Sequence, residues 1–148
     1  MAPPRMAIAC AAMPSLFTRI IAGDLPAQQV FSDPRFVAIM DLGPANPGHC
    51  LLIPRHEAQY LAQLPEPVLA ALGPALTRLI SAVKGATGCP AVNVLINDGP
   101  EANQAVPHAH VHIIPRWPGD GKLVHPKGAA YQGDEMAVLA ARLRAAAG

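Results

Sequence analysis

One stretch limits the possible fold and function of this chain more than any other. It is His108-Ala109-His110-Val111-His112-Ile113-Ile114-Pro115-Arg116. Three histidines alternate with small or apolar residues, and alternation with a period of two is typical of a β-strand. The pattern predicts a strand that directs three imidazoles to one face and apolar side chains to the other. Because imidazole carries a nucleophilic nitrogen and has a pKa near neutrality, this face indicates either a nucleophilic histidine with helpers or a metal site.

The bulk composition limits the class of protein and its partners. A length of 148 residues predicts about one domain, and 51% hydrophobic with 14% charged residues is typical of a globular chain. A net charge of +1 gives no basic field, so we expect no nucleic-acid partner. No apolar run approaches the roughly 18 residues of a membrane span, so we expect no membrane partner. Three cysteines without CxxC spacing argue against a disulfide framework and favour a cytoplasmic location.

Periodicity and turn residues predict the elements. Residues 1–13 are expected to form a disordered leader, and residues 14–148 a single domain. Short apolar segments predict a helix over 16–22 and strands over 29–32, 36–41, 49–53 and 91–96, with the histidine strand following a polar loop over 97–107. Longer stripes of apolar residues at helical spacing predict helices from 65 to about 84 and over 135–147. The fold class is therefore α+β with an antiparallel sheet.

The central histidine of the predicted strand suits attack on phosphorus. A neutral imidazole at His110 would be the nucleophile, while His108 and His112 on the same face would donate to phosphate oxygens or carry a proton. Three imidazoles on one strand also suit zinc, although no Asp, Glu or Cys lies close by in the sequence to complete the shell. The strand pattern alone leaves both interpretations open.

Two residues upstream of the histidines and one loop supply further candidate site residues. His49 starts a strand after Pro-Gly and is either a site residue at the sheet end or a surface turn residue. Asp41 precedes a Pro/Gly loop, where a carboxylate either binds a ribose diol or caps the turn. Asn97, Asn103 and Gln104 lie in the loop before the histidines, where side-chain amides and backbone N–H groups suit phosphate binding.

Together these segments resemble the histidine-triad (HIT) superfamily of nucleotide hydrolases and transferases. The segment Phe17-Thr18-Arg19-Ile20-Ile21-Ala22-Gly23-Asp24-Leu25-Pro26-Ala27 is similar to the opening of the Hint branch. A second family block is matched by Asp41 with Pro47-Gly48-His49-Cys50-Leu51-Leu52-Ile53-Pro54. The segments Asn97–Gln104 and His108–Arg116 are closer to the Fhit branch.

This resemblance implies a HIT-like five-stranded antiparallel sheet with two main helices, paired as a homodimer. It implies no cofactor, and it favours the nucleophilic interpretation of the histidines over a metal site. The implied catalytic residues are the nucleophile His110 with His108, His112 and His49. The implied substrate-binding residues are Asp41 at the ribose and Asn97, Asn103 and Gln104 at the phosphate loop.

Several positions depart from the family pattern. Ala105 stands where Hint-type proteins carry a serine, which weakens a phosphoramidase assignment. Asn103 replaces a common glycine, and His56 stands one place before the usual histidine. Ser15 and Thr18 stand where many bacterial members have two zinc-binding cysteines, so the resemblance implies no such structural zinc here.

Three hypotheses follow. The first is a nucleotide hydrolase or transferase that cleaves a substituted purine nucleoside α-phosphate through a covalent nucleotidyl-histidine. Its substrate would be a dinucleoside polyphosphate, a nucleoside phosphoramidate or an adenylate. The alternative is a nucleotide-binding regulatory protein with weak catalysis. The third is a zinc protein that uses His49, His108 and His112.

Overall fold

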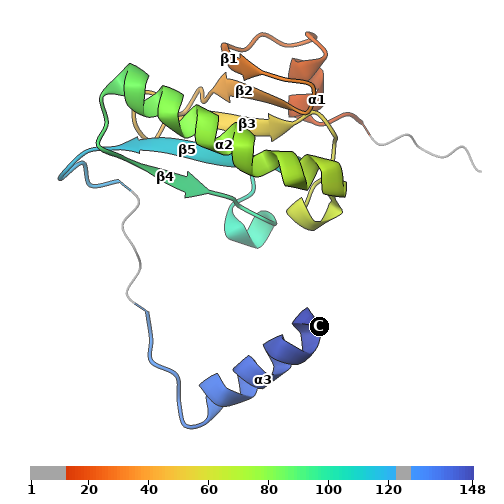
Figure 1. Ribbon diagram of the computed structural model, residues 1–148, viewed down its shortest axis with the longest axis vertical. Helices are drawn as coiled ribbons and strands as arrows, with labels where there is room; N and C mark the ends of the chain where they lie inside the picture. The colour runs from red at the N-terminus through yellow and green to blue at the C-terminus, as the bar shows by residue number, and fades with distance from the viewer. Residues whose placement is uncertain (1–12, 123–127) are drawn as a thin grey trace, which may run out of the picture.

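The computed structural model describes residues 13–122 and 128–148. Its centre is a five-stranded antiparallel sheet of order β1-β2-β3-β5-β4 (Figure 1). The strands are β1 (Gln29–Ser32), β2 (Phe36–Met40), β3 (Cys50–Pro54), β4 (Ala91–Leu95) and β5 (Val111–Arg116). The α-helices are α1 (Leu16–Ile21), α2 (Glu66–Thr87) and α3 (Glu135–Ala147), with 3-10 turns η1 (Leu61–Gln63) and η2 (Pro100–Ala102). The predicted α+β class and five-stranded antiparallel sheet are confirmed.

Helices cover both faces of the central strands, because successive residues of a strand point to opposite sides. The long helix α2 crosses one face, and the short helix α1 lies on the other (Figure 1). The buried cluster beneath α2 consists of Phe36, Ala38, Cys50, Leu52, Ala75, Leu79, Val83, Cys89, Val111 and Ile113. The cluster beneath α1 consists of Phe17, Ile20, Val37, Ile39, Leu51 and Ile53. Since Val111 and Ile113 face α2, the alternate position His112 faces α1.

The ends of the helices follow from their capping residues. Ser15 caps α1, because its side chain accepts a hydrogen bond from the Thr18 N–H at 3.0 Å. The helix α2 has a proline in its first turn and ends at Gly88, whose φ of 69° places it in the left-handed region. The predicted end near residue 84 was therefore three residues too early.

The histidine strand begins later than predicted. Regular strand structure starts at Val111, so His108 and His110 both lie before it and only His112 lies within it. A tight turn accounts for the difference, because the His108 N–H donates to the Val106 carbonyl at 2.8 Å. The next N–H, of Ala109, donates to the Ala58 carbonyl at 2.7 Å rather than to a neighbouring strand.

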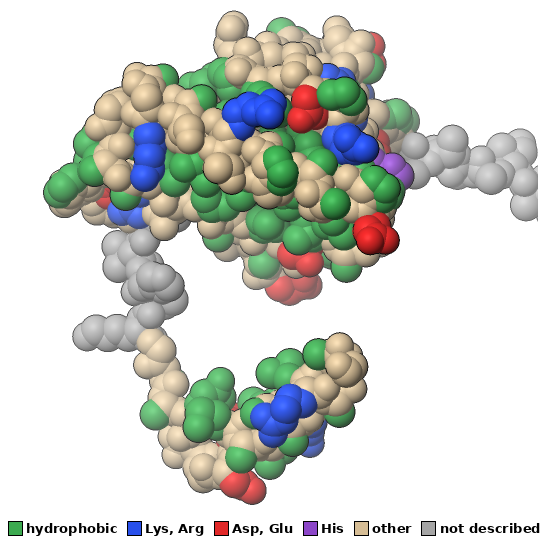
Figure 2. Space-filling view, in the orientation of Figure 1, with side chains coloured by type: hydrophobic (Ala, Val, Ile, Leu, Met, Phe, Trp, Pro, Cys, Tyr) green, Lys and Arg blue, Asp and Glu red, His purple; other side chains and the backbone are tan. Residues whose placement is uncertain are grey.

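Away from the sheet, α3 forms where the sequence predicted it, and it has no buried residue. Figure 1 shows it apart from the sheet. On the face shown in Figure 2, basic and acidic side chains are scattered among hydrophobic ones. Among the described residues, α2 is the helix with the length and apolar character of a membrane span, and its residues Ala75, Leu79 and Val83 pack on the sheet. Of the predicted leader, residues 1–12 lie outside the described part.

Candidate active site

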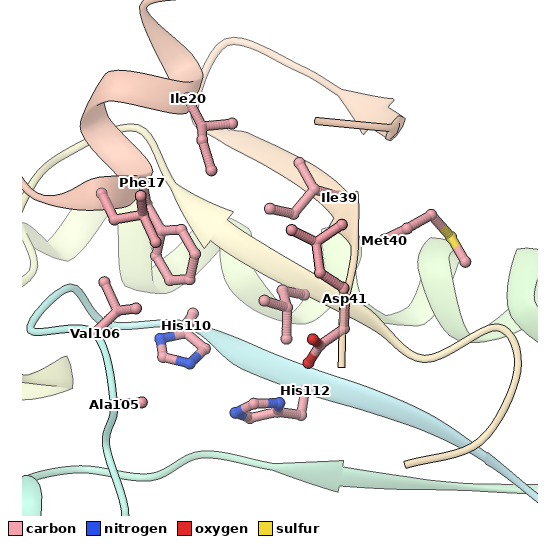
Figure 3. Close-up of a pocket in the computed structure, with 12 residues that line it drawn as sticks. Phe17, Ile20, Ile39, Met40, Asp41, Ala105, Val106, His110 and His112 are labelled. Carbon is pink, nitrogen blue, oxygen red and sulfur yellow. The ribbon is translucent and has the colours of Figure 1, made fainter. Parts of the chain in front are cut away.

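A cavity of about 240 Å³ opens on the α1 side of the sheet, where β2 ends and β5 begins. Its walls are mostly apolar, and its polar side chains are Asp41, His110 and His112. Figure 3 shows the Asp41 carboxylate directed toward these two imidazoles, with the Phe17 ring on the other side of His110. The cavity is lined by Leu16, Phe17, Ile20, Ile39, Met40, Asp41, Leu42, Leu51, Ala105, Val106, His110 and His112.

His110 presents a lone pair to this cavity. Its Nδ1 lies 2.7 Å from the backbone carbonyl oxygen of His108. Because a carbonyl only accepts, Nδ1 must carry the proton, and in a neutral ring the lone pair then belongs to Nε2. Burial lowers the pKa of His110, which favours that neutral ring. The local backbone thus produces the tautomer that a nucleophile needs.

Two successive hydrogen bonds, through His49, fix the tautomer of His112. The Ala45 N–H donates to Nδ1 of His49 at 3.1 Å, so the proton of that ring is on Nε2. Nε2 of His49 lies 3.0 Å from Nδ1 of His112 and donates to it. The proton of His112 must therefore be on Nε2, which is buried and has no partner among the described residues. This N–H is a donor available to a bound ligand.

His112 stays uncharged at neutral pH. Its pKa is lowered from 6.5 to about 4, first by burial and then by the neighbouring rings of His110 and His49. The ring centroids of His110 and His112 are 4.8 Å apart, in an edge-to-face arrangement. The pair therefore offers one lone pair and one N–H side by side without a positive charge.

Asp41 is the one acidic side chain that lines the cavity. Its Oδ1 accepts a hydrogen bond from the Gly43 N–H at 2.8 Å, and its Oδ2 lies 3.5 Å from Nε2 of His49. The ligating atoms of Asp41, His49 and His112 lie within 4.8 Å of one another, a donor set that suits zinc. Asp41 therefore caps the turn and also lines the cavity, and its contact with a ribose stays a prediction.

His108 lies on the α1 side of the sheet with His110 and His112, as predicted, but it does not line the cavity. The ring is fully buried, its Nε2 lies 2.8 Å from the Pro54 carbonyl oxygen, and its Nδ1 lies 2.6 Å from Oγ of Ser15. The ring packs edge-on against Phe17 with centroids 5.8 Å apart, and both of its nitrogens are held in hydrogen bonds. The donor atoms that gather with those of His49 and His112 come from Asp41 and not from His108, so the zinc site built from His49, His108 and His112 is wrong.

The residues at the position of the family's structural zinc do not fit that metal. Ser15 and Thr18 offer neutral hydroxyl oxygens, whereas structural zinc is held by thiolate and imidazole ligands. Both hydroxyls are engaged in hydrogen bonds to neighbouring side chains, Ser15 to His108 and Thr18 to the Glu57 carboxylate.

The polar loop before the histidines shapes the rim of the cavity. Nδ2 of Asn97 donates to the Asn103 carbonyl at 3.2 Å, and Asn103 has a φ of 64°. The Gln104 amide donates to the Gln59 carbonyl at 2.7 Å and accepts from the Gly99 N–H at 3.2 Å. None of these three side chains lines the cavity, which is lined instead by Ala105 and Val106. Their contact with substrate stays a prediction.

Sequence reasoning missed two parts of the site. Phe17 packs edge-on against His110 with ring centroids 5.0 Å apart, and an isolated aromatic on a short helix gave no signal for this. Glu57 was also missed, although His56 beside it was noted. Beyond the histidines, the Arg116 guanidinium pairs with the Asp120 carboxylate at 2.6 Å.

The sequence pattern of the HIT domain matches residues 22–119. An adenylylsulfatase of Arabidopsis thaliana is 36% identical over 68% of this chain, which spans about half (51%) of that protein. An adenosine 5'-monophosphoramidase of Schizosaccharomyces pombe is 35% identical over 70% of this chain and 75% of its own length. A crystal structure of a Streptococcus mutans protein superposes with a TM-score of 0.85 at 26% identity, over 95% of this chain and 90% of that one. The histidine geometry and these matches agree, and the chain belongs to the HIT family.

Proposed function

We propose that this protein is a nucleotide hydrolase or transferase that cleaves a substituted nucleoside α-phosphate through a covalent intermediate on His110. The observation that carries the proposal is the tautomer of His110, whose Nδ1–H is bound to the His108 carbonyl while Nε2 is free beside the cavity. Two relatives named adenylylsulfatase and adenosine 5'-monophosphoramidase support the same class of reaction.

In the first step, the Nε2 lone pair of His110 forms a bond to the α-phosphorus. The bond from phosphorus to the leaving group breaks, and the leaving group departs with that electron pair. His110 then carries the nucleotidyl group as an imidazolium, whose Nδ1–H remains bound to the His108 carbonyl. That hydrogen bond strengthens as positive charge develops on the ring.

In the second step, water attacks the phosphorus and the P–N bond breaks, returning its electron pair to Nε2. Over the cycle, one water supplies hydroxyl to phosphorus and a proton to the leaving group. The unpartnered Nε2–H of His112 donates to a phosphate oxygen in both steps and stabilises the charge that develops there. His49 holds that donor in place.

The lining of the cavity supports the proposal of a nucleotide substrate. Apolar side chains such as Ile20 and Ile39 suit the face of a purine, and the Asp41 carboxylate suits the two hydroxyls of a ribose. The chain has a net charge of +1, so phosphate is held by local N–H donors rather than by a basic surface. We further propose that the protein is a homodimer, as the family resemblance implies, and that it is cytoplasmic, as its three cysteines without CxxC spacing suggest.

The test is to trap the intermediate. Protein is mixed with an adenosine phosphoramidate and, separately, with a diadenosine polyphosphate, then quenched and analysed by mass spectrometry. We expect an adenylyl adduct on His110. The His110→Ala variant should lose turnover by at least about a thousandfold while still binding AMP. Turnover of this variant near the wild-type rate would contradict the mechanism.

A nucleotide-binding regulatory role is the second candidate, and Ala105 favours it. This residue lines the cavity beside the histidines, and its methyl group offers no hydrogen bond to a leaving group. AMP binding without turnover on either substrate would favour this role over the hydrolase.

A further inference from the structure

A polar cluster that runs from the surface to a buried histidine lies outside the cavity. It consists of Ser15, Thr18, Glu57 and His108, and we call it the Ser15 cluster. His108 is 0% exposed and Ser15 is 8% exposed. The distance from Oγ of Ser15 to Nδ1 of His108 is 2.6 Å. Ser15 and His108, which are 93 positions apart in the sequence, are thus joined by a short buried hydrogen bond.

The positions of the hydrogens in this cluster follow from donor and acceptor chemistry. The Pro54 carbonyl only accepts, so Nε2 of His108 carries a proton. Burial lowers the pKa of His108 and favours the neutral ring, which leaves a lone pair on Nδ1. Ser15 must then donate its single hydroxyl proton to that lone pair. Thr18 in turn donates its own hydroxyl proton to the Glu57 carboxylate.

The cluster connects directly to the nucleophile. The carbonyl oxygen that accepts the Nδ1–H of His110, at 2.7 Å, belongs to His108. Anchoring the His108 ring at Ser15 and Pro54 therefore holds the carbonyl that selects the tautomer of His110. The two rings adopt opposite tautomers, with the proton on Nε2 in His108 and on Nδ1 in His110.

We propose that Ser15 is a positioning residue for the reaction: its hydroxyl holds the His108 ring, and through the His108 carbonyl it fixes the tautomer and orientation of His110. The effect on turnover rests on the proposed function, whereas the effect on the tautomer does not. Ser15 touches neither the cavity nor the reacting atoms.

Ser15 has a second role that the experiment must separate. It caps α1, and α1 carries Phe17 against His110. Glycine is tolerated at a helix N-cap at little cost, so Ser15→Gly removes the donor to His108 while largely sparing the helix. Ser15→Thr keeps both the cap and the donor. Thr18→Val removes a hydroxyl of the same cluster but leaves the Ser15 donor in place, and it is the matched control.

The experiment combines kinetics on an adenosine phosphoramidate with ¹⁵N NMR of histidine-labelled protein. In the wild type we expect the NMR signature of a single tautomer for each of His108 and His110. In Ser15→Gly we expect kcat to fall at least about tenfold with KM within about threefold, and His110 to show a mixture of tautomers. Ser15→Thr should restore both readouts, and Thr18→Val should stay within about twofold of the wild-type kcat.

A Ser15→Gly protein with wild-type kcat overturns the proposal. So does a fall in kcat with an unchanged single tautomer of His110, because that result assigns the loss to the helix cap. If the wild type turns over neither substrate class, the proposed function fails, and the NMR comparison alone decides the role of Ser15. If Ser15→Gly does not fold, Ser15→Asp replaces it with the same expected outcomes, because an ionised aspartate caps a helix as well as serine and has no proton to donate to His108.

Discussion

The uncharged state of His112 makes the stability of the fold sensitive to acid. Its pKa is about 4 in the folded protein, against 6.5 for an ordinary histidine. Between these values the unfolded chain binds a proton at this ring and the folded chain does not. The free energy of unfolding should therefore fall as the pH drops from about 6.5 to about 4, by up to about 3 kcal/mol from this residue.

Urea unfolding at pH 7 and at pH 5 measures this loss, and His112→Asn is the control because it removes the titrating ring. The variant should lose less stability between the two pH values than the wild type. Equal losses would contradict a buried neutral His112. The lowered pKa values of His49, His108 and His110 act in the same direction and remain in both proteins.

At the scale of single residues, the sequence pattern predicted where the histidines of the candidate site lie, but not which side chains hold them in place. The alternation correctly placed all three rings on the α1 side of the sheet, although regular strand structure begins only at Val111. It gave no sign that His108 is enclosed between Ser15 and Pro54 instead of lining the cavity. Contacts between distant residues, such as Ser15 with His108, have no periodic signal and could not be predicted.

At the scale of elements, the loop between β2 and β3 packs closely against the end of α2 at Gly48. Gly48 has a φ of 92°, and a Cβ there would lie 2.5 Å from Cγ2 of Thr87 at the end of α2. Gly48→Ala should lower the free energy of unfolding by about 1–3 kcal/mol, because it adds both backbone strain and a clash. Urea denaturation measures the change.

Thr87→Ser separates the clash from the backbone strain. It removes Cγ2, with which the new methyl group would clash, and keeps the hydroxyl that donates to the Val83 carbonyl. The cost of Gly48→Ala should be smaller in the Thr87→Ser background by at least about 0.5 kcal/mol. The same cost in both backgrounds would show that α2 does not approach this loop closely.

Element boundaries could be predicted where a local residue sets them. The bounds of β1 and α3 agree with the prediction, because a turn or a capping region flanks each. The end of α2 was misjudged because Gly85 continues the helix and Gly88 ends it. Both glycines look alike in the sequence, and Gly88 differs in having the left-handed φ of 69° that ends the helix.

At the scale of the whole molecule, strand order was beyond the sequence pattern. The sheet places β5 between β3 and β4, so β3 pairs with a strand about 60 residues away (Cys50 with Ile113). Periodicity shows which side chains share a face but not which strands are neighbours. The five strands and the two longer helices were expected from periodicity as well as from the family resemblance. The helices that cover the sheet are α2 and the short α1, whereas α3 has no buried residue.

The two edges of the sheet differ, and the difference predicts how a homodimer forms. The edge strand β1 has an irregular register between Gln29 and Phe31, and a bulge discourages pairing with another chain. The opposite edge strand β4 pairs regularly with β5 and exposes Val94 and Leu95. We therefore expect two copies to associate through β4.

Light scattering after size-exclusion chromatography measures this association. The wild type should have the mass of two chains. Val94→Lys places a charge on the β4 edge and should give the mass of one chain, because a buried unpaired charge opposes association. Val30→Lys is the matched control on β1, where Val30 is 50% exposed, against 42% for Val94, and it should remain a dimer. A wild type with the mass of one chain, or dissociation by Val30→Lys alone, would contradict the assignment of β4, because a lysine disrupts association only on the edge that the partner covers.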